Sequence, residues 1–314
     1  MKVLFIAGEL KNSTGMSPFI FSQGKSLIEH GTDIRYLILR GPGFIKDIKG
    51  IFTLKKHLRK ETYDIIHAHY SYCGFTATFQ NNTPVLLSFM GSDLLEKYGF
   101  IRTAAERYIK NRIFGRIKHF ICKSEEMGKC MPASAVYWVV PNGVDLNTFY
   151  RIDKADARKK LGLREDAKYV LFASNPSRKE KNFALAAESV KEMEDPNVIL
   201  LTVYDRSQAE LNLFYNASDA LLLTSDYEGS PNIIKEALVC GLPIVSTEVG
   251  DVRELAGAGP GNCIVPRDRK SIALKLKETV YSAPLPVNIM ITENLDGRKT
   301  AMKIAGIYKT IKQR

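Results

Sequence analysis

Short apolar runs alternate with longer helical segments along the whole 314-residue chain. Such runs are typical of buried parallel strands, and the segments between them are long enough for crossover helices. We expect strands at residues 2–7, 34–39, 64–68, 84–89, 119–122 and 136–140 in the first half, and near residues 168–173, 198–203, 219–224, 243–246 and 263–265 in the second. The pattern predicts an α/β fold of parallel sheets covered by helices.

The pattern repeats after a turn signal, Pro141-Asn142-Gly143, which indicates two domains. We expect two tandem Rossmann-like, doubly wound domains facing a cleft, one at residues 1–149 and one at residues 150–314. The last helix, predicted near residues 295–312, could pack back onto the first domain. Further helices are expected at about 18–30, 47–60, 71–79, 102–118, 124–129 and 154–161. Domains of this kind bind ligands at the carboxyl ends of their strands.

The segment from Glu228 to Glu236 places two carboxylates around a turn that follows an apolar run. Ser230 is a suitable N-cap and Pro231 a suitable first helical residue, so Glu236 would lie in the first turns of a helix. Carboxylates accept hydrogen bonds from hydroxyls, and the N–H groups of residues 229–232, at the helix start, would favour an anion. The segment suits a polyol attached to phosphate. Alternatively, Glu228 is a loop charge and Glu236 lies on a solvated face.

The formal net charge of +11 lies mostly in the first half, because residues 1–150 contain 20 basic and 12 acidic side chains. This excess suggests an anionic partner: membrane lipid, a phosphorylated acceptor or nucleic acid. Nucleic acid is disfavoured because no known nucleic-acid-binding motif is visible. The five scattered cysteines indicate reduced thiols in the cytosol. We expect neither a signal peptide nor a membrane-spanning run.

Several motifs resemble the retaining glycosyltransferases of family four, which have the GT-B fold. They occur in the family's order over nearly the whole chain: residues 63–69, 141–145 with Phe149, 216–219, the pair Glu228 and Glu236, and 241–245. The resemblance implies that the second domain binds a nucleotide sugar and the first domain an acceptor. It also implies retention of the anomeric configuration through a front-face mechanism, without a covalent enzyme intermediate.

By this resemblance, Glu236 would bind the ribose hydroxyls of the donor, and Glu228 would hold the hexose as a positioning and electrostatic residue. The backbone N–H groups of Gly229, Ser230, Pro231 and Asn232 would assist. Two cations, Arg178 and Lys181, follow the first strand of the second domain and could stabilise charge on the departing phosphate. Such cations remove the need for a metal, and no Asp-x-Asp motif is present, so we expect no metal and no cofactor besides the donor substrate.

Some positions depart from the family's pattern. Pro176 stands where family members carry an arginine, so which cation reaches the phosphate first is open, and a solvated basic loop is the alternative for Arg178 and Lys181. Asn182 replaces a glycine, and Met90 replaces a histidine. Met90 cannot donate a hydrogen bond from its side chain.

In the first domain, Gly15 is expected to contact phosphate or acceptor, or else to form a simple tight turn. Asp93 could act as base or hydroxyl anchor for the acceptor, or as an N-cap for residues 94–98. Of the alternating His67 and His69, one could face the core and the other the cleft, with His69 the better candidate for the cleft; a packed core histidine is the favoured alternative for either.

Basic side chains on residues 46–60 and 102–118 could dock on anionic lipid, although an ordinary core helix with a solvated face is the alternative for residues 102–118. The sequence thus predicts a hexosyltransferase that uses a nucleotide-diphosphate sugar and a glycan or lipid-linked acceptor. The expected setting is bacterial cell-surface polysaccharide or glycolipid synthesis, in the cytoplasm or on the inner face of the membrane. The alternative is a binding or scaffold subunit that kept the donor pocket but lost catalysis. The sequence does not name the donor base, the sugar or the acceptor.

Overall fold

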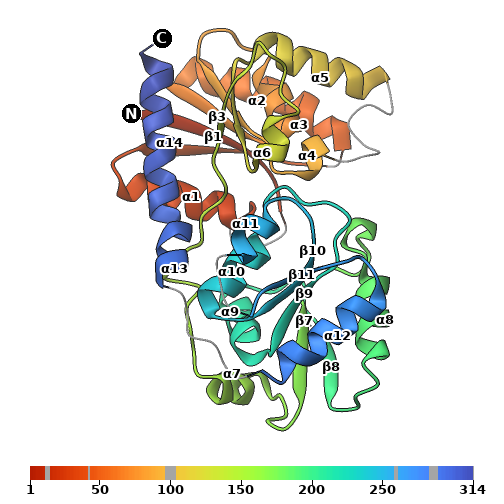
Figure 1. The fold of residues 1–314 in the computed structure, drawn as a ribbon. Helices are drawn as coiled ribbons and strands as arrows, with labels where there is room; N and C mark the ends of the chain where they lie inside the picture. Colours follow the sequence, from red (N-terminus) through yellow and green to blue (C-terminus); the bar gives the residue numbers. More distant parts are fainter. Residues whose placement is uncertain (11–14, 42, 96–103, 258–260, 283–288, 314) are drawn as a thin grey trace. The chain divides into compact units, whose positions relative to one another are not determined.

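The computed structural model describes residues 1–10, 15–41, 43–95, 104–257, 261–282 and 289–313, with only the backbone at residues 43–47, 92, 105 and 289. The chain forms two compact units (Figure 1). The first consists of Met1–Gly143 with Gly297–Arg314, and the second of Val144–Asp296. Each unit contains one parallel sheet, so the predicted α/β architecture is confirmed.

The first unit has a six-stranded sheet in the order β2-β1-β3-β4-β5-β6. Its strands are β1 (Lys2–Gly8), β2 (Asp33–Leu39), β3 (Ile65–His69), β4 (Val85–Ser88), β5 (His119–Cys122) and β6 (Val136–Val139). Its helices are α1 (Pro18–Glu29), α2 (Gly43–Lys60), α3 (Ser71–Ala77), α4 (Ser92–Leu95), α5 (Ala104–Arg116), α6 (Glu125–Gly128) and α14 (Gly297–Lys312).

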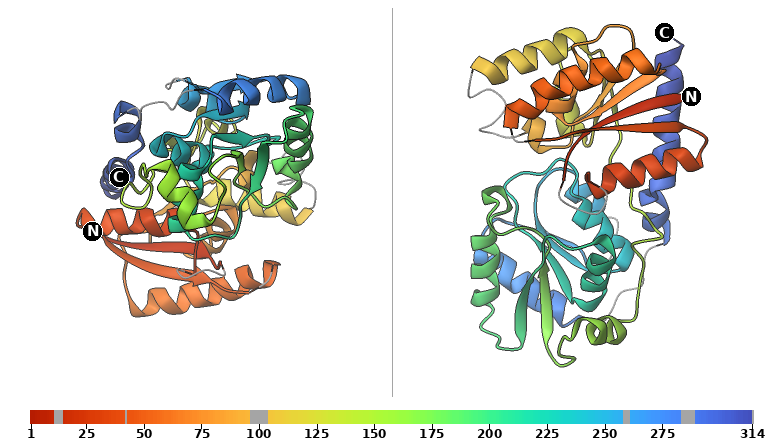
Figure 2. Two further views of the ribbon diagram at one scale, coloured as in Figure 1. Left: turned by 90° about the horizontal axis from the view of Figure 1, so that it is seen from below. Right: turned by 180° about the vertical axis from the view of Figure 1, so that it is seen from behind.

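Strand β1 shows why the strands of the first sheet are continuous apolar runs in the sequence. Leu4 and Ile6 pack with helices α2, α3 and α5, whereas Val3, Phe5 and Ala7 pack with α1 and α14. Successive side chains of a strand point to opposite faces, so a strand covered by helices on both sides needs apolar residues at every position. Figure 2 shows these two layers of helices on the first sheet.

The second unit has a five-stranded sheet in the order β11-β10-β9-β7-β8. Its strands are β7 (Lys168–Phe172), β8 (Val198–Thr202), β9 (Ala220–Leu223), β10 (Ile244–Thr247) and β11 (Cys263–Val265). Its helices are α7 (Lys154–Leu161), the 3₁₀ turn η1 (Lys179–Lys181), α8 (Phe183–Glu192), α9 (Gln208–Ala217), α10 (Asn232–Cys240), α11 (Val252–Ala256), α12 (Arg269–Val280) and α13 (Ile289–Leu295).

The second sheet is also covered on both faces. Leu171 and Leu221 pack on the side of α9, α10 and α11, while Val170 and Leu222 pack on the side of α8 and α12. In both units the first strand lies inside the sheet, and the chain winds away from it in one direction and then in the other. The winding reverses between β1 and β3 in the first unit and between β7 and β9 in the second. The carboxyl ends of such strand pairs are where doubly wound sheets bind ligands.

The C-terminal helix differs from the prediction of one helix at residues 295–312. The structure has α13 and α14 with a break at Asp296, whose backbone forms a parallel bridge with Val144. At the adjacent positions, a Cβ on Gly143 would lie 2.4 Å from the Cα of Gly297. Gly143 therefore has no room for a side chain, which explains the glycine of the Pro-Asn-Gly turn.

Candidate functional site at the carboxyl edge of the second sheet

Lys181 and Glu228 form an ion pair where the winding of the second sheet reverses. Lys181 follows β7 and Glu228 follows β9, and Lys181 Nζ lies 2.5 Å from Glu228 Oε1. The side chains are 11% and 14% exposed. Ser225 Oγ donates to the same carboxylate oxygen at 2.7 Å. The structure thus brings together a predicted phosphate-binding cation and a predicted sugar-binding carboxylate at the strand ends where ligands are expected.

The two loops that carry this pair are fastened to each other. Thr224 Oγ1 donates to the carbonyls of Lys181 and Asn182 at 3.0 Å, and the Asp226 N–H donates to the Glu180 carbonyl at 2.8 Å. Asn182 has φ of 51°, in the left-handed region that asparagine tolerates better than most residues. This conformation explains how Asn182 can replace the glycine of the related motif.

Arg178 lies apart from the ion pair. Its side chain is 52% exposed and its Nη2 lies 2.5 Å from Glu180 Oε1 within the same loop. A second guanidinium reaches the site from a distant segment, because Arg267 Nη1 lies 2.6 Å from Asp226 Oδ1 and its Nη2 donates to the Ser225 carbonyl at 3.0 Å. Arg267 is not predictable from the sequence, since no motif links it to Asp226, 41 positions earlier.

The start of α10 corrects a prediction. Pro231, rather than Ser230, occupies the N-cap, and the helix begins at Asn232. The Ser230 hydroxyl instead donates to Asp251 Oδ2 at 2.5 Å, across to the loop after β10. Pro231 has no backbone N–H, so it cannot supply one of the predicted anion-binding donors.

A buried polar cluster lies under this loop. The Lys235 side chain is fully buried, and its Nζ donates to the Ser230 carbonyl at 3.5 Å. Burial lowers the pKa of Lys235 to about 8, although the nearby Asp251 carboxylate acts to raise it. Burial also raises the pKa of Asp251. Sequence reasoning missed this pair, because a lysine beside Glu236 on a helix gives no signal of burial.

Glu236 lies further along α10 and faces α9. The Tyr215 hydroxyl donates to Glu236 Oε2 at 2.7 Å. Burial raises the pKa of Glu236 to about 7, although the Tyr215 hydrogen bond and the Lys235 charge lower it. Glu228 and Glu236 therefore have different partners, and Glu236 is poised to change its charge near neutral pH.

In the first unit, both carboxylate oxygens of Asp93 accept hydrogen bonds from backbone N–H groups. Its Oδ1 accepts from the N–H groups of Met90 and Gly91, at 2.8 and 3.1 Å, and its Oδ2 accepts from the Ser71 N–H at 2.9 Å. Burial raises the pKa of Asp93 to about 6, while these N–H donors lower it. Because α4 begins at Ser92, Asp93 lies inside that helix, so the predicted N-cap role for residues 94–98 is wrong.

His67 and His69 point to the same side of β3, because alternate residues of a strand share a face. Their ring centroids are 4.2 Å apart and both side chains are fully buried. The expectation that one faces the core and the other a cleft is therefore wrong, and the alternative of two packed core histidines is confirmed. His67 Nδ1 lies 2.6 Å from Tyr308 Oη, and its Nε2 lies 2.8 Å from Ser88 Oγ. Among the described residues, His69 has no hydrogen-bond partner.

Gly15 lies in the loop after β1, with φ of 69°, and its carbonyl accepts from the Leu10 N–H at 3.0 Å. Residues 11–14 lie outside the description. Pro18 begins α1 as predicted, but Ser17, at the N-cap, makes no side-chain capping bond. The structure thus shows the turn at Gly15 and leaves its contact with a ligand as a prediction.

The basic helices α2 and α5 are only partly described. The Lys46 side chain and residues 102–103 lie outside the description. Ile109, Ile113 and Ile117 are buried, as in an ordinary core helix and the turn that ends it, and the Arg112 guanidinium lies 3.9 Å from the centre of the Phe79 ring.

Within the described ranges, no helix has the length and apolar character to cross a membrane. The same ranges hold no cluster of three or more His, Cys, Asp and Glu side chains suited to a metal ion.

Residues 15–148 match the family described as Glycosyltransferase Family 4, and residues 152–280 match the family described as Glycosyl transferases group 1. The chain therefore belongs to family four, a family of retaining glycosyltransferases. Among solved structures, sucrose-phosphate synthase from Thermosynechococcus elongatus aligns with a TM-score of 0.82 and 16% identity, over 99% of this chain and 98% of that one. WaaG, a glycosyltransferase of lipopolysaccharide biosynthesis, aligns with a TM-score of 0.72 and 12% identity, over 98% and 99%. These similarities show the GT-B fold.

Two curated bacterial relatives are more similar in sequence. The Escherichia coli UDP-Gal:alpha-D-GlcNAc-diphosphoundecaprenol alpha-1,3-galactosyltransferase is 25% identical over 284 residues, covering 77% of this chain and 70% of the relative. The putative teichuronic acid biosynthesis glycosyltransferase TuaC of Bacillus subtilis is 24% identical over 245 residues, covering 70% of this chain and 62% of the relative.

Proposed function

We propose that this glycosyltransferase moves a hexosyl group from a nucleotide-diphosphate sugar to a hydroxyl acceptor, with retention of configuration. The observation that carries the proposal is the Lys181–Glu228 ion pair at the reversal point of the second sheet. A diphosphate offers Lys181 more negative charge than one carboxylate does. Its arrival would release Glu228 to accept hydrogen bonds from sugar hydroxyls.

Each remaining site residue has a role consistent with its place in the second unit. Glu236 would accept hydrogen bonds from the ribose hydroxyls, since its carboxylate lies on the helix that follows the Glu228 loop. Gly229, Ser230 and Asn232 would present backbone N–H groups to the donor, while Pro231 would fix the loop. Arg178 would approach the phosphate only after leaving Glu180, so Lys181 would be the first cation to stabilise the leaving group.

In the first unit we assign Asp93 a positioning role toward the acceptor. Its carboxylate holds the N–H groups of Met90 and Gly91, and Gly91 has φ of 120°, so Asp93 sets the shape of the loop after β4. We assign Gly15 to a contact with donor phosphate or acceptor, because its loop follows the first strand of a doubly wound sheet at the reversal point.

A uridine diphosphate sugar is the first donor to test. The name of the E. coli relative specifies UDP-Gal, and the Anabaena HepE structure with UDP-glucose aligns with a TM-score of 0.74. For the acceptor, the same relative's name specifies a sugar on diphosphoundecaprenol, and TuaC is named for teichuronic acid biosynthesis. We therefore propose a lipid-linked or polymeric glycan acceptor used at the cytoplasmic face of a bacterial membrane.

The proposal is tested by a thermal-shift screen of UDP, GDP and ADP sugars, followed by transfer assays on an undecaprenyl-diphosphate-linked sugar. We expect stabilisation by a UDP-sugar, and a product that NMR shows to have the donor's anomeric configuration. Binding of a nucleotide sugar without turnover on any acceptor would favour the alternative, a binding subunit of a glycan-assembly complex.

A further inference from the structure

We propose that the second unit has another anion site, at the amino edge of its sheet, that binds a small organic phosphate. A pocket of about 360 Å³ lies there, lined by residues of α7 and by the ends of α9, α10 and α12. Lys168 begins β7, Asp219 precedes β9 and Pro243 precedes β10. Lys181 and Glu228 follow β7 and β9, so this pocket lies at the opposite edge of the sheet from the proposed donor site.

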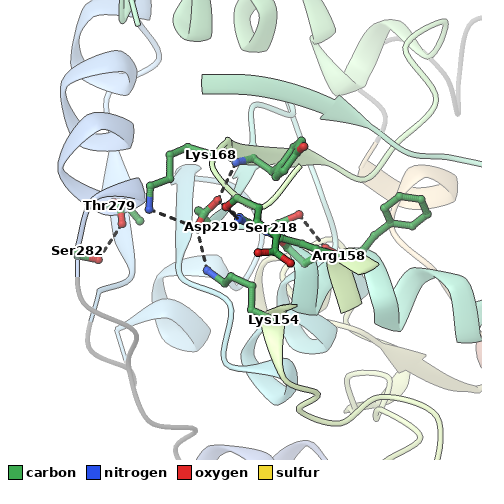
Figure 3. A network of polar contacts seen from close by, with 11 residues as sticks. Lys154, Arg158, Lys168, Ser218, Asp219, Thr279 and Ser282 are labelled. Carbon is green, nitrogen blue, oxygen red and sulfur yellow. Dashed lines mark hydrogen bonds and ion pairs between the residues drawn. The ribbon is translucent and has the colours of Figure 1, made fainter. Parts of the chain in front are cut away.

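The lining carries a surplus of positive charge. The lining holds more basic than acidic side chains: Arg151, Lys154, Arg158 and Lys168, with Asp153 and Asp219. Asp153 is engaged elsewhere, because its Oδ1 accepts the N–H groups of Ala155 and Asp156 at the start of α7. Asp219 is therefore the carboxylate at the centre of the cluster (Figure 3).

Arg158 has a structural role that needs no ligand. Its Nη2 lies 2.7 Å from Asp219 Oδ2, and its other nitrogens donate to the carbonyls of Ala217 and Glu165 at 2.9 and 2.7 Å. The Tyr169 N–H also donates to Asp219 Oδ2. These bonds fasten α7 to the sheet and involve every nitrogen of the guanidinium and one carboxylate oxygen.

The two lysines are not explained by that structural role. Both approach the other oxygen of Asp219, with Lys154 Nζ at 2.9 Å and Lys168 Nζ at 3.9 Å, and their side chains are 41% and 32% exposed. One carboxylate, already paired with Arg158, cannot neutralise two further ammonium groups that also repel each other. A doubly charged anion between Lys154 and Lys168 would remove that repulsion and form charge-assisted hydrogen bonds with both.

The pocket suits more than inorganic phosphate alone. Its volume lies within the range of about 300–1,000 Å³ typical of small-molecule sites. Ile152, Leu242 and Val280 add apolar surface beside the cations. Phosphate oxygens would lie against the two lysines and a carbon skeleton against these side chains. Tyr215 lines the pocket and also bonds to Glu236, so the test substitutions leave Tyr215 unchanged.

Lysine footprinting on the full chain tests the site without any substitution. Reductive methylation with and without millimolar pyrophosphate or glucose 6-phosphate, followed by peptide mass spectrometry, measures protection of each lysine. We expect methylation of Lys154 and Lys168 to decrease when the anion is present. Lys159 should show no protection, because it is exposed on α7, the helix that carries Lys154, but lies outside the pocket. Protection of Lys181 would report donor-site binding separately. Absence of protection at both Lys154 and Lys168 would overturn the proposal.

Calorimetry with pyrophosphate gives a second, independent readout. Lys168→Met and Lys154→Met should each weaken binding by about tenfold, which corresponds to loss of one charge-assisted contact, while Lys159→Met should bind as the wild type does. Lys181→Met should keep binding at this pocket and lose only the binding of pyrophosphate at the donor site, which separates the two sites. Equal weakening by Lys159→Met and Lys168→Met would show general attraction to positive charge and would overturn the specific site.

Discussion

Glu236 illustrates how burial can couple a side chain to ligand binding at the scale of one residue. Burial raises the pKa of this carboxyl to about 7, and only the ionised form accepts hydrogen bonds with both oxygens. A ligand whose hydroxyls donate to the carboxylate therefore binds better as the proton leaves. We expect the Kd for UDP to fall as the pH rises through about 7.

Two variants separate this effect from general pH sensitivity. Glu236→Gln should bind UDP more weakly and with a flat pH profile over the same range. Tyr215→Phe removes the hydroxyl whose hydrogen bond lowers the pKa of Glu236, so the rise in affinity should move to higher pH. Calorimetry in buffers of matched ionic strength measures both. An unchanged pH profile in Glu236→Gln would exclude Glu236 as the group responsible.

Residue-level prediction succeeded where chain position alone indicates proximity. Lys181 and Glu228 follow strands that are neighbours in the sheet, so their convergence follows from the predicted topology. Asp251 and Arg267 reach the same loops from segments more than 20 residues away, and no sequence pattern connects them to the site. The chemical roles assigned to the site residues remain predictions.

At the scale of elements, the loop that carries Glu228 depends on a close approach between two backbones. Gly250 has φ of 52°, and a Cβ there would lie 2.6 Å from the Gly229 carbonyl oxygen. We expect Gly250→Ala to displace the loop, to lower the melting temperature and to weaken UDP binding. Gly162→Ala is the matched control, because Gly162 has φ of 66° with no neighbour within 4 Å.

Gly162→Ala should lower the free energy of unfolding only by the strain of the left-handed conformation, about 1–2 kcal/mol, and should leave UDP affinity unchanged. Thermal unfolding and calorimetry on both variants test this. If Gly250→Ala binds UDP as well as Gly162→Ala does, the close contact does not shape the donor site.

Asp93 fastens the loop after β4 to the start of α3, and this role can be separated from base catalysis. In Asp93→Asn, one carboxylate oxygen becomes an NH₂ group, which cannot accept from the N–H groups that Asp93 now binds. We expect a loss of about 1–3 kcal/mol in stability, together with reduced turnover. A variant that melts as the wild type does but has lost turnover would instead support a role as general base.

Prediction of the elements failed where a distant segment decides the boundary. The strands follow from apolar periodicity, and β2, β5, β11 and helix α7 lie at or within one residue of their predicted bounds. The break between α13 and α14 depends on pairing of Asp296 with Val144, and the start of α10 depends on a bond from Ser230 to Asp251. Neither contact leaves a local signal in the sequence.

At the scale of the whole molecule, the uneven charge predicts attachment to anionic membranes through the first half of the chain. Lys55, Lys56, Arg59 and Lys60 are exposed on α2, and near-surface cations each contribute about 1 kcal/mol of attraction to anionic lipid. We expect co-sedimentation with phosphatidylglycerol vesicles that weakens as salt is added. Lys55→Glu with Lys56→Glu should abolish it.

Lys159→Glu with Lys160→Glu is the matched control, since it makes the same charge change on α7 of the second unit. Equal loss of vesicle binding in both double variants would show dependence on net charge alone. Retained binding in the α2 variant would place any membrane contact elsewhere.

The central claim, that Lys181 and Glu228 form the donor site, is tested most directly by UDP affinity in three proteins: the wild type, Lys181→Met and Glu228→Gln. We predict that Lys181→Met weakens UDP binding by about tenfold or more, because a charge-assisted contact to phosphate is lost. Glu228→Gln should bind UDP at least as tightly as the wild type, because Lys181 no longer has to leave its carboxylate partner. Wild-type affinity in Lys181→Met, or weaker binding in Glu228→Gln, would contradict the account.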